Sequence, residues 1–299
     1  MYQTIVAGCD GSAHGLAAAR FAAWLARRLG SRLIVAAAYT HTTHVRTDGG
    51  AAEGQARAEA EAAAQAGIAA VGGIGAARPL VASGSSPAAV LHDVARAEQA
   101  DLLVVGTSER RRIAGTQPGS VTEHVLRHSP CPVAVVPPSD TEPTVRRLGV
   151  AMDDQPPARA ALGAARRLAE RLGPELAEIV LLHAALPEPM FLRPGVQLTA
   201  ATSVDTPAWL GTLADDLDAP VSLRVVTEAG RPGTMVAEPA HDLDLLVMGS
   251  RDLGAVRRVV LGSVSTHVVR HAPCPVIVEL GRATAERTDD VVTSAGTAD

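Results

Sequence analysis

Short runs of apolar, often β-branched residues alternate along this chain with longer Ala-rich segments in which apolar residues recur at helical spacing. The runs in the first half are residues 4–9, 32–38, 78–83, 101–106 and 132–136. The runs in the second half are residues 148–152, 178–184, 221–226, 244–249 and 275–280. Strands that are apolar throughout and alternate with helices predict a parallel sheet covered by helices on both faces. We therefore expect an α/β fold.

The two halves carry nearly the same text. Residues 119–135 read GSVTEHVLRHSPCPVAV and residues 262–278 read GSVSTHVVRHAPCPVIV, so 11 of their first 15 positions are identical. The same offset of 143, which is 262 minus 119, pairs Gly30 with Gly173, and each of these glycines predicts the end of a helix. Short solenoid units repeat at about 20–50 residues. The longer period therefore indicates two copies of one whole domain.

The repeat predicts the domain boundaries. We expect a first domain at residues 1–138, a second at residues 146–281, and a mobile tail at residues 282–299, which are polar and lack a core pattern. The Pro-rich segment 137–145 joins the two copies and is short enough to keep them close together.

Two segments break the regular alternation. Residues 40–56 are rich in Thr, His and Gly, and residues 186–206 contain several prolines without a helical period. We expect both segments to be loops that follow the second strand of their copy.

The composition narrows the class of protein. Hydrophobic residues make up 47% of the chain and aromatic residues only 2%, so the core must be built from Ala, Val and Leu. A net charge of −5 provides no basic field for nucleic acid, and small molecules are the expected partners. The chain starts without a signal-peptide pattern, and no apolar run approaches the roughly 18 residues of a membrane span. We expect a cytoplasmic protein.

The cysteines are too few for a disulfide framework or a metal cluster. Cys131 and Cys274 are equivalent in the repeat and stand at the start of a strand, and Cys9 ends the first apolar run. We expect all three to be small buried thiols of the core.

Polar groups that suit a ligand stand where predicted strands end, which is where open α/β sheets bind their ligands. Asp10 ends the first strand, and Asp153 ends its counterpart in the second copy. A Gly-Ser pair opens the last helix of each copy, so free backbone N–H groups and the positive end of the helix dipole suit a phosphate there. The plain alternative is that Ser120 and Ser263 only cap their helices.

These features together resemble the universal stress protein family in its tandem two-domain form. The resemblance rests on the strand that ends in Asp, the Gly-rich loop and the ending GSVxxHVxRHxPCPV, and it covers nearly the whole chain twice. It implies two tandem copies of an open five-stranded parallel sheet with helices on both faces, a Rossmann-like fold of the adenine nucleotide alpha hydrolase type. In the ATP-binding branch of the family a G-x2-G-x9-G-(S/T) loop wraps the phosphates, and the strand-end Asp lies beside the ribose and triphosphate.

The resemblance carries a binding site over to each copy. In the first copy it consists of Asp10, Gly106, Gly119, Ser120 and Val121, with Ala38 as the adenine wall. In the second copy it consists of Asp153, Gly249, Arg251, Gly262, Ser263 and Val264, with Ala184 as the adenine wall. The implied ligand is ATP, which family members often bind with Mg2+, and either Asp could contact that ion through water. No cage of metal ligands is visible in the sequence.

The middle glycine of the motif is missing in both copies. Glu109 replaces it in the first and Asp252 in the second. A glycine would allow a positive φ and close approach of a polyphosphate, whereas a carboxylate adds like charge. At 4 Å this repulsion is about 1 kcal/mol in water and about 4 kcal/mol at an effective dielectric of about 20, enough to weaken binding by about one to three decades.

Arginines lie near these carboxylates in both copies. They are Arg110, Arg111 and Arg112 in the first copy and Arg251, Arg257 and Arg258 in the second. They could neutralise a carboxylate or a phosphate, or simply form a solvated basic loop. Arg251 matches a family position that faces the phosphates, whereas the first copy has Ser108 there. We therefore expect the second copy to bind nucleotide better, although Asp154 and Gln155 replace the small Gly11 and Ser12 beside its aspartate.

Two Ser–His pairs raise the question of catalysis. Ser120 with His124 and Ser263 with His267 share a helix face, but there is no nucleophile elbow and no third group to orient the histidine. His128 and His271 continue the same stripe near the helix end, where packing and the helix dipole explain them. We expect no enzyme, or at most very slow ATP hydrolysis.

Three functions follow from these patterns. The first is a nucleotide-responsive stress protein in which ATP or a related adenine nucleotide acts as a regulatory switch. The second is a module that does not bind nucleotide and acts in dimerisation or interaction, with Glu109 and Asp252 as marks of the loss. In related family members the last strand pairs across subunits, so the resemblance implies that the fifth strands, residues 132–136 and 275–280, join the two copies of one chain or two chains of a homodimer. The third, a hydrolase or adenylating enzyme, has the least support because a fold does not confer chemistry.

Overall fold

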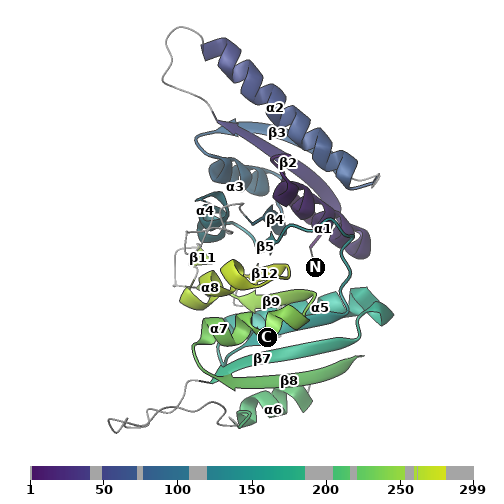
Figure 1. Cartoon of the computed structure of the whole chain (residues 1–299), viewed down its shortest axis with the longest axis vertical. Helices are drawn as coiled ribbons and strands as arrows, with labels where there is room; N and C mark the ends of the chain where they lie inside the picture. Colours follow the sequence, from purple (N-terminus) through teal and green to yellow (C-terminus); the bar gives the residue numbers. More distant parts are fainter. Residues whose placement is uncertain are drawn as a thin grey trace, which may run out of the picture.

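The computed structural model describes residues 2–40, 49–72, 77–107, 120–185, 205–215, 221–252, 259–260 and 262–280. The described residues form one ten-stranded sheet, a separate two-stranded hairpin, and helices on both faces of the sheet (Figure 1). The predicted tail, residues 282–299, and nearly all of the predicted loop 186–206 lie outside the described residues.

The sheet consists of the predicted strands of both copies. The strands of the first copy are β1 (Thr4–Gly8), β2 (Arg32–Thr40), β3 (Ala77–Gly84), β4 (Leu102–Gly106) and β5 (Val133–Val136). Those of the second copy are β6 (Arg147–Met152), β7 (Glu178–Ala185), β8 (Ser222–Ala229), β9 (Leu245–Gly249) and β12 (Val276–Glu279). Their order is β3-β2-β1-β4-β5-β12-β9-β6-β7-β8, so both copies share one topology. The predicted α/β class with two tandem five-stranded parallel sheets is confirmed.

The fifth strands join the two sheets into one. β5 and β12 pair antiparallel, with Val276 opposite Val135 and Ile277 opposite Ala134, while every other pair of neighbours in the ten-stranded sheet is parallel. Of the two alternatives for the fifth strands, the structure contains the pairing within the chain. The antiparallel join also turns the carboxyl ends of the strands to opposite sides in the two copies, so their candidate sites open in opposite directions.

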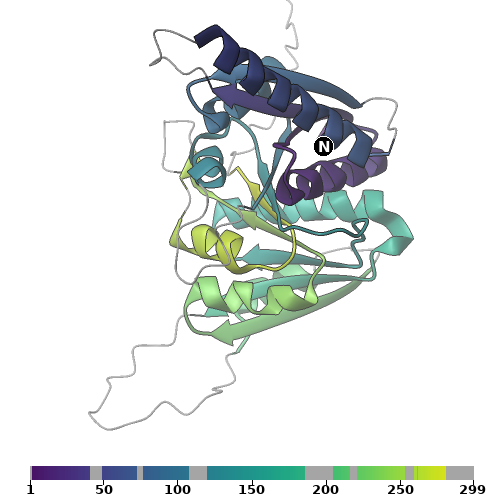
Figure 2. The ribbon, with the colours of Figure 1, turned by 45° about the horizontal axis from the view of Figure 1, so that its top comes forward.

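The helices lie in two layers, one on each face of the sheet. In the first copy they are α1 (Ala13–Leu29), α2 (Gly49–Ala70), α3 (Pro87–Ala97) and α4 (Ser120–His128). In the second copy they are α5 (Pro156–Leu172), α6 (Ala208–Asp215), α7 (Pro232–Ala237) and α8 (Ser263–His271), with short 3-10 turns η2 (Gly173–Glu175) and η3 (Pro239–Asp242). α1 and α5 lie side by side on one face, and α3, α4, α7 and α8 cover the other (Figure 2).

The core follows the strict alternation of the strands. Ile5 and Val104 face the α1 and α5 layer, while Val6 faces the α3 and α4 layer, and all three are fully buried. The α1 and α5 core is continuous across the two copies, from Phe21 on α1 to Leu168 on α5. As the composition predicted, most of these core residues are Ala, Val or Leu, and several isoleucines join them.

Cys9, Cys131 and Cys274 are buried free thiols, as expected. Burial raises the pKa of Cys274 to about 12. This thiol therefore stays protonated at neutral pH, which fits a core residue better than a nucleophile.

The predicted helix ends are confirmed. α1 ends at Leu29, and Gly30 follows with a φ of 68° and donates its N–H to the carbonyl of Ala26. α5 ends at Leu172, and Gly173 follows with a φ of 59°. Both glycines adopt the positive φ that other residues avoid.

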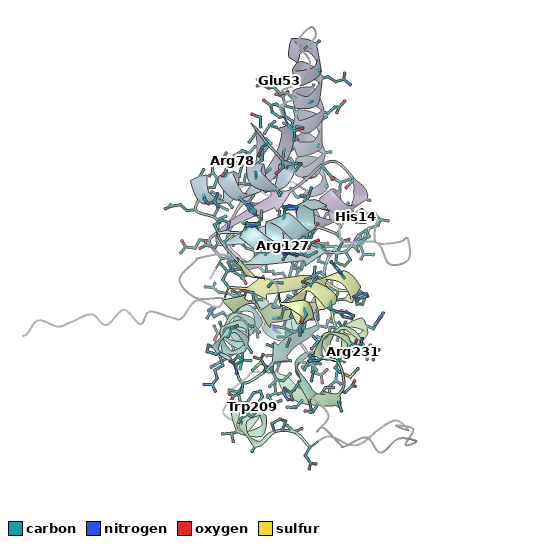
Figure 3. The ribbon with its side chains drawn as sticks, turned by 90° about the vertical axis from the view of Figure 1, so that its left-hand side faces the viewer. His14, Glu53, Arg78, Arg127, Trp209 and Arg231 are labelled. Carbon is teal, nitrogen blue, oxygen red and sulfur yellow. The ribbon has the colours of Figure 1, made fainter. Side chains whose placement is uncertain are left out.

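The predicted loop at residues 40–56 is wrong in part. Residue 40 belongs to β2, residues 41–48 lie outside the described part, and α2 already begins at Gly49. The prediction gave too much weight to the glycines. Residues from Ala51 onward are mostly Ala, Glu, Gln and Arg, which favour helix, and an Arg57–Glu61 pair at i,i+4 supports it. The first half of α2 is exposed and projects beyond the sheet, as Glu53 in Figure 3 shows.

Among the described helices, none combines the length and the apolar character needed to cross a membrane.

Candidate nucleotide site in the second copy

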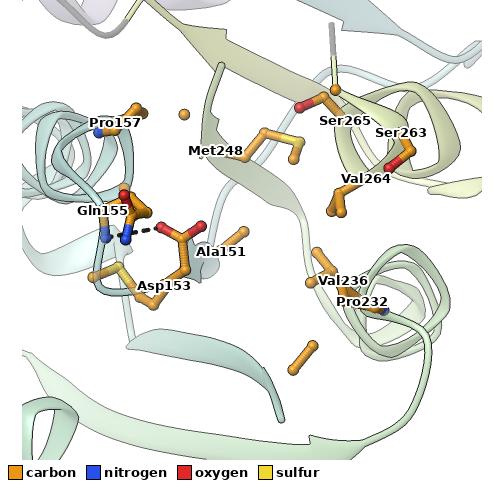
Figure 4. A pocket seen from close by; sticks show the side chains of 15 residues that line it. Ala151, Asp153, Gln155, Pro157, Pro232, Val236, Met248, Ser263, Val264 and Ser265 are labelled. Carbon is orange, nitrogen blue, oxygen red and sulfur yellow. Dashed lines mark hydrogen bonds between the residues drawn. The ribbon is translucent and has the colours of Figure 1, made fainter. Parts of the chain in front are cut away.

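A cavity opens at the carboxyl ends of β6, β7 and β9, and it brings together most residues that the sequence predicted for the second copy. It has a volume of about 240 Å3 and lies between the start of α5, the start of α7 and the start of α8 (Figure 4). The lining residues are Ala151, Met152, Asp153, Gln155, Pro157, Ala158, Ala184, Pro232, Val236, Met248, Gly249, Gly262, Ser263, Val264 and Ser265. Asp153, Ala184, Gly249, Gly262, Ser263 and Val264 are thus placed around one crevice.

The walls of the crevice are mainly apolar. Val236 on α7 and Val264 on α8 line the crevice together with Met248 on β9, and Ala184 lines it from the end of β7 (Figure 4). None of these side chains is charged, so this wall of the crevice neither attracts nor repels a charged group strongly. A flat, largely apolar ring is therefore the shape and chemistry that this part of the crevice accommodates.

Strand register supports the alignment of Ala38 with Ala184. Gly8 on β1 pairs with Ala36 on β2, and Ala151 on β6 pairs with Leu182 on β7. Because Gly8 and Ala151 are equivalent in the repeat, the residues two places further along, Ala38 and Ala184, occupy the same position of the two sheets.

The first turn of α8 presents backbone donors to the crevice. Gly262 is its N-cap with extended backbone, φ −65° and ψ 164°, and it provides no side-chain capping hydrogen bond. The first backbone hydrogen bond of the helix runs from the N–H of Thr266 to the carbonyl of Gly262. The N–H groups of Ser263, Val264 and Ser265 therefore precede the helical ladder, and they can donate to an anion.

Asp153 shapes the turn between β6 and α5. Its Oδ1 accepts a hydrogen bond of 3.2 Å from the N–H of Gln155, and its side chain is exposed at the crevice mouth (Figure 4). Asp10 does the same in the first copy with two donors, since its Oδ1 accepts from the N–H of Ser12 at 3.1 Å and from the Ser12 hydroxyl at 2.6 Å. In each copy the Oδ1 atom of the strand-end aspartate accepts the hydrogen bonds that hold the turn.

The first glycine of each loop has a packing role. A Cβ on Gly249 would lie 2.3 Å from the carbonyl oxygen of Pro157, and a Cβ on Gly106 would lie 2.5 Å from the carbonyl oxygen of His14. The first turn of α5 or α1 thus sits directly on the strand end, and only glycine fits. This contact would require glycine whether or not the loop binds a phosphate.

The structure describes less of the first crevice. The Gly106 carbonyl accepts a hydrogen bond of 3.0 Å from the Thr122 hydroxyl, and Val121 is half-buried at the start of α4. Gly119, Ser108, Glu109 and the arginines Arg110, Arg111 and Arg112 lie outside the described residues, as does the side chain of Ser120. The predicted phosphate loop of this copy therefore stays a prediction.

The loop of the second copy contains a short hairpin that the sequence did not predict. β10 (Arg251–Asp252) pairs antiparallel with β11 (Val259–Val260), with Arg251 opposite Val260. The side chains of Arg251 and Asp252, and all of residues 253–258, lie outside the described part. β11 lies beside α4 of the first copy (Figure 1). The loop of the second site therefore lies beside α4, the helix at whose start the first site was predicted.

Several lining residues were also missed. Met248 and Val236 line the crevice but belong to no motif, and Gln155, which the sequence showed only as the replacement for Ser12, lines it as well. Met248 could have been found because it precedes the strand-end Gly249. The α7 residues carry no local signal, since only the sheet order brings that helix to the crevice.

In the second copy the two histidines of α8 contact each other. His267 stacks on His271 with ring centroids 4.1 Å apart, and His271 Nδ1 lies 2.7 Å from the carbonyl of His267. Partial burial, with the nearby His271 and Arg270, lowers the pKa of His267. These contacts agree with helix-end packing. Among the described residues, no group of three or more His, Cys, Asp or Glu side chains forms a metal site.

A second cavity of about 1000 Å3 lies between the copies, but its carboxylates are already engaged. Asp101 accepts hydrogen bonds from the N–H groups of Gln3 and Thr4, Asp154 pairs with Arg159 at 2.9 Å, and the hydroxyl of Tyr2 donates to Glu279. Of these contacts, only the one between Tyr2 and Glu279 joins the two copies. The smaller crevice is therefore the better candidate for a ligand.

Comparison with known proteins agrees with this architecture. The model of the universal stress protein family matches residues 1–137 and again residues 144–278. A universal stress protein of Mycobacterium tuberculosis is 32% identical over 191 residues, which are 60% of this chain and 62% of that protein, less than two thirds of its length.

Two solved structures are also similar. One from Archaeoglobus fulgidus, a universal stress protein, has a TM-score of 0.66 at 22% identity and covers 94% of this chain and 99% of its own. A universal stress protein in complex with cAMP matches 46% of this chain and 99% of its own, with 28% identity and a TM-score of 0.33.

Proposed function

The chain belongs to the universal stress protein family, and from that premise we propose that the crevice of its second copy binds ATP or a related adenine nucleotide as a regulatory switch. The observation that carries this proposal is the convergence of Asp153, Ala184, Gly249 and the Gly262–Val264 turn on one cavity. These residues come from three separate stretches of the sequence. Their meeting around one crevice supports a common ligand.

The apolar wall would hold the adenine. Ala184 leaves room beside β7, and Met248, Val236 and Val264 provide contacts for an aromatic ring. The cavity of about 240 Å3 is small beside the roughly 300–1,000 Å3 of typical ligand pockets, so part of the nucleotide would extend beyond its mouth.

The phosphates would lie at the first turn of α8. The N–H groups of Ser263 and Val264 have no acceptor within the helix, and the helix dipole stabilises a negative charge there by roughly 0.3–1 kcal/mol, or more when partly buried. Arg251 follows β9 on the same loop. Its positive charge would offset the negative charge of Asp252, which repels the phosphates. Mg2+ would accompany the phosphates, with Asp153 near the ribose and the ion.

We place the better site in the second copy. In the second copy, within the described part of the chain, Asp153 accepts only a backbone hydrogen bond of 3.2 Å, from the N–H of Gln155. In the first copy the Ser12 hydroxyl binds Asp10 at 2.6 Å, which engages that carboxylate more strongly in its own turn. Binding would act without rapid hydrolysis, because in the second copy His267 stacks on His271 and, among the described residues, no hydrogen bond joins it to the Ser263 hydroxyl.

The second candidate function is an interaction module without nucleotide. The replacement of the middle glycine by Glu109 and Asp252 favours it, as does the small volume of the crevice. In such a protein the sheet and its free edges would recognise a partner, and the crevice would remain as a packing feature of the fold.

A titration of the full chain with Mg-ATP by isothermal calorimetry separates the two functions. We expect saturable binding that Ala184→Phe abolishes, because the larger ring fills the adenine wall. Ala38→Phe is the matched control, since it makes the same change at the equivalent position of the first copy and leaves the second site intact. Native mass spectrometry of gently purified protein should also find retained adenine nucleotide.

Two results would favour the interaction module. One is the absence of both heat and thermal stabilisation at millimolar Mg-ATP. The other is equal binding by the wild type and Ala184→Phe. Asp252→Gly distinguishes an impaired site from a lost one, because restoring the motif glycine should tighten binding by about tenfold or more if the site still works.

A further inference from the structure

The two ends of the ten-stranded sheet are built differently. β3 and β8 are the terminal strands and lie at opposite ends of the molecule (Figure 1). In the described part of the chain, neither has a strand neighbour on its outer side. An unpaired strand edge exposes a row of backbone donors and acceptors, and proteins either protect it or use it.

Proline protects the β3 edge. Pro79 pairs in register with Val35 on β2, and Val225 on β8 pairs with Leu181 on β7. Val35 and Leu181 are equivalent, because their partners Ala7 and Val150 are 143 residues apart. Pro79 and Val225 therefore occupy the same position of the two copies. A proline there removes the N–H that another strand would need.

The β8 edge keeps its full set of hydrogen-bonding groups. The N–H of Gly230 donates to the carbonyl of Ala185 on β7 at 3.1 Å. Backbone groups alternate along a strand, so Glu228, Val226 and Arg224 also direct theirs toward β7. Leu223, Val225, Thr227 and Ala229 consequently direct their N–H and C=O groups outward. No proline interrupts β8.

The side chains of one β8 strand are complementary to those of a second, antiparallel β8 strand. Arg224, Val226 and Glu228 share one face of the strand, with the two charges two residues to either side of the valine. Both charged side chains are exposed and Val226 is half-buried. If a second β8 pairs antiparallel about Val226, each Arg224 lies opposite a Glu228. Pairing about Arg224 or about Glu228 would instead place like charges opposite each other.

The backbone and the side chains select the same register. With Val226 opposite Val226, the outward-facing Val225 lies opposite the outward-facing Thr227, so both can exchange ladder hydrogen bonds. Val226 and the Arg224–Glu228 pairs then fall at positions without hydrogen bonds, where opposing side chains are closest.

The surroundings of Arg224 also favour this pairing. A groove of about 290 Å3 along β8 contains Glu228, Glu238 and Asp242, and none of these carboxylates has an ion-pair partner among the described residues. Arg224 is the cation of this groove, and it binds Glu178 through Nε at 2.9 Å and Nη2 at 3.4 Å. A guanidinium has five donors, so Arg224 can bridge Glu178 and Glu228 of the partner subunit.

We propose that the free edge of β8 is a self-association surface, and that two copies of this chain pair antiparallel about Val226 through the Arg224–Glu228 pairs. Such an interface is isologous and closes with twofold symmetry. It repeats between chains what β5 and β12 do within one chain, where antiparallel pairing already joins two parallel sheets.

Sedimentation velocity over a wide concentration range tests the proposal. The wild type should show a concentration-dependent dimer. Val225→Pro should weaken it by about tenfold or more while the thermal midpoint stays near that of the wild type, because the lost N–H points outward and Pro79 shows that the position accepts proline. A wild type that stays monomeric at every concentration, or a dimer that Val225→Pro does not weaken, would overturn the proposal.

Charge variants test the register. Glu228→Arg places Arg opposite Arg twice in the dimer and should weaken it by about tenfold, while the double variant Arg224→Glu with Glu228→Arg restores opposite charges and should recover dimerisation. Equal weakening by the single and double variants would contradict this register.

A disulfide gives a second test of the register. Val226→Cys should cross-link two chains under mild oxidation, because the closest antiparallel positions suit a disulfide and the native cysteines are buried. Ser222→Cys is the matched control on the same strand face, and in this register it lies too far from its own copy to react. Cross-linking of Ser222→Cys but not Val226→Cys would refute the pairing about Val226.

Discussion

At the scale of single residues, burial decides the chemistry of the titratable groups. His92 on α3 is only 6% exposed, and its Nε2–H donates to the carbonyl of Val125 on α4 at 3.1 Å. Burial, with smaller effects of Arg96 and His128, lowers the pKa of His92 below its usual value. The imidazole is therefore neutral in the folded protein at neutral pH and serves as a hydrogen-bonding core residue.

The lowered pKa of His92 makes stability depend on pH. The unfolded chain takes up a proton near the usual pKa of about 6.5, whereas the folded chain resists protonation, so the free energy of unfolding should fall as pH drops below about 6.5. The slope from this group is at most about 1.4 kcal/mol per pH unit. Urea unfolding at several pH values measures it. His92→Gln keeps a donor for Val125 but does not titrate, so an unchanged slope in this variant would show that other groups are responsible.

Tyr2 and Glu279 form a second buried polar contact, at the junction of the copies. Each is 8% exposed, and the Tyr2 hydroxyl donates to the Glu279 carboxylate at the end of β12. Burial and the charge of Glu279 raise the pKa of Tyr2 well above its usual value. The phenol therefore stays protonated at neutral pH and remains a donor.

Removal of this donor should destabilise the fold. Tyr2→Phe takes one hydrogen bond from a buried carboxylate and should cost about 1–3 kcal/mol in free energy of unfolding, as measured by denaturant titration at neutral pH. Glu279→Gln keeps an acceptor for Tyr2 and should cost less. Because the folded pKa of Tyr2 is raised, its contribution is complete below about pH 10 and is lost as pH rises toward the folded value. Wild-type stability in Tyr2→Phe would contradict this role.

At the scale of elements, the hydrophobic periodicity predicted the strands, and the glycines predicted the helix ends. Both signals could be read from the sequence because they are local. Gly30 and Gly173 end their helices where the repeat placed them. The start of α2 was missed because three glycines near residues 49–54 suggest a loop, while the stabilising Arg57–Glu61 pair and the alanines act further along the helix. The hairpin of β10 and β11 was missed because two-residue strands carry no periodic signal.

A pair of glycine substitutions distinguishes two kinds of glycine in these elements. Gly249→Ala would place a Cβ 2.3 Å from the Pro157 carbonyl oxygen, so we expect a loss of about 1–3 kcal/mol and a lower melting temperature. Gly54→Ala lies within α2 with nothing within 4 Å of its Cβ, and it should stabilise the protein by up to about 1 kcal/mol. Differential scanning calorimetry compares the two, and a stabilising Gly249→Ala would show that α5 does not press on β9 as described.

At the scale of the whole molecule, the repeat predicted two similar sheets, but only the structure shows that they form a single sheet. The edge that β5 presents to β12 depends on the strand order, which no local pattern encodes. The same limit applies to the candidate site. Strand-end positions such as Asp153 and Gly249 could be predicted from motifs, whereas Val236 reaches the crevice only through the position of α7. The domain boundaries at residues 138 and 146 stay a prediction.

Contacts on several levels hold the copies together. Beyond the β5–β12 pairing, Arg28 on α1 binds Glu175 of the second copy at 2.6 Å, and Arg27 binds Glu142 of the connecting segment at 2.8 Å. These pairs are partly exposed, so each contributes about 1 kcal/mol or less. The continuous core between α1 and α5 and the shared strand ladder must therefore provide most of the coupling.

This coupling predicts that the two copies unfold as one cooperative unit. Unfolding either half would expose one fifth strand and half of the core between α1 and α5, so an intermediate with one folded copy should be unstable. Calorimetry should give one transition with equal calorimetric and van't Hoff enthalpies. Ala134→Lys places a charge at a fully buried position opposite Ile277, and it should split the transition into two by weakening the join. Two transitions in the wild type would mean that the antiparallel strand pair only tethers two independent domains, and that a ligand in one crevice could not affect the other through the sheet.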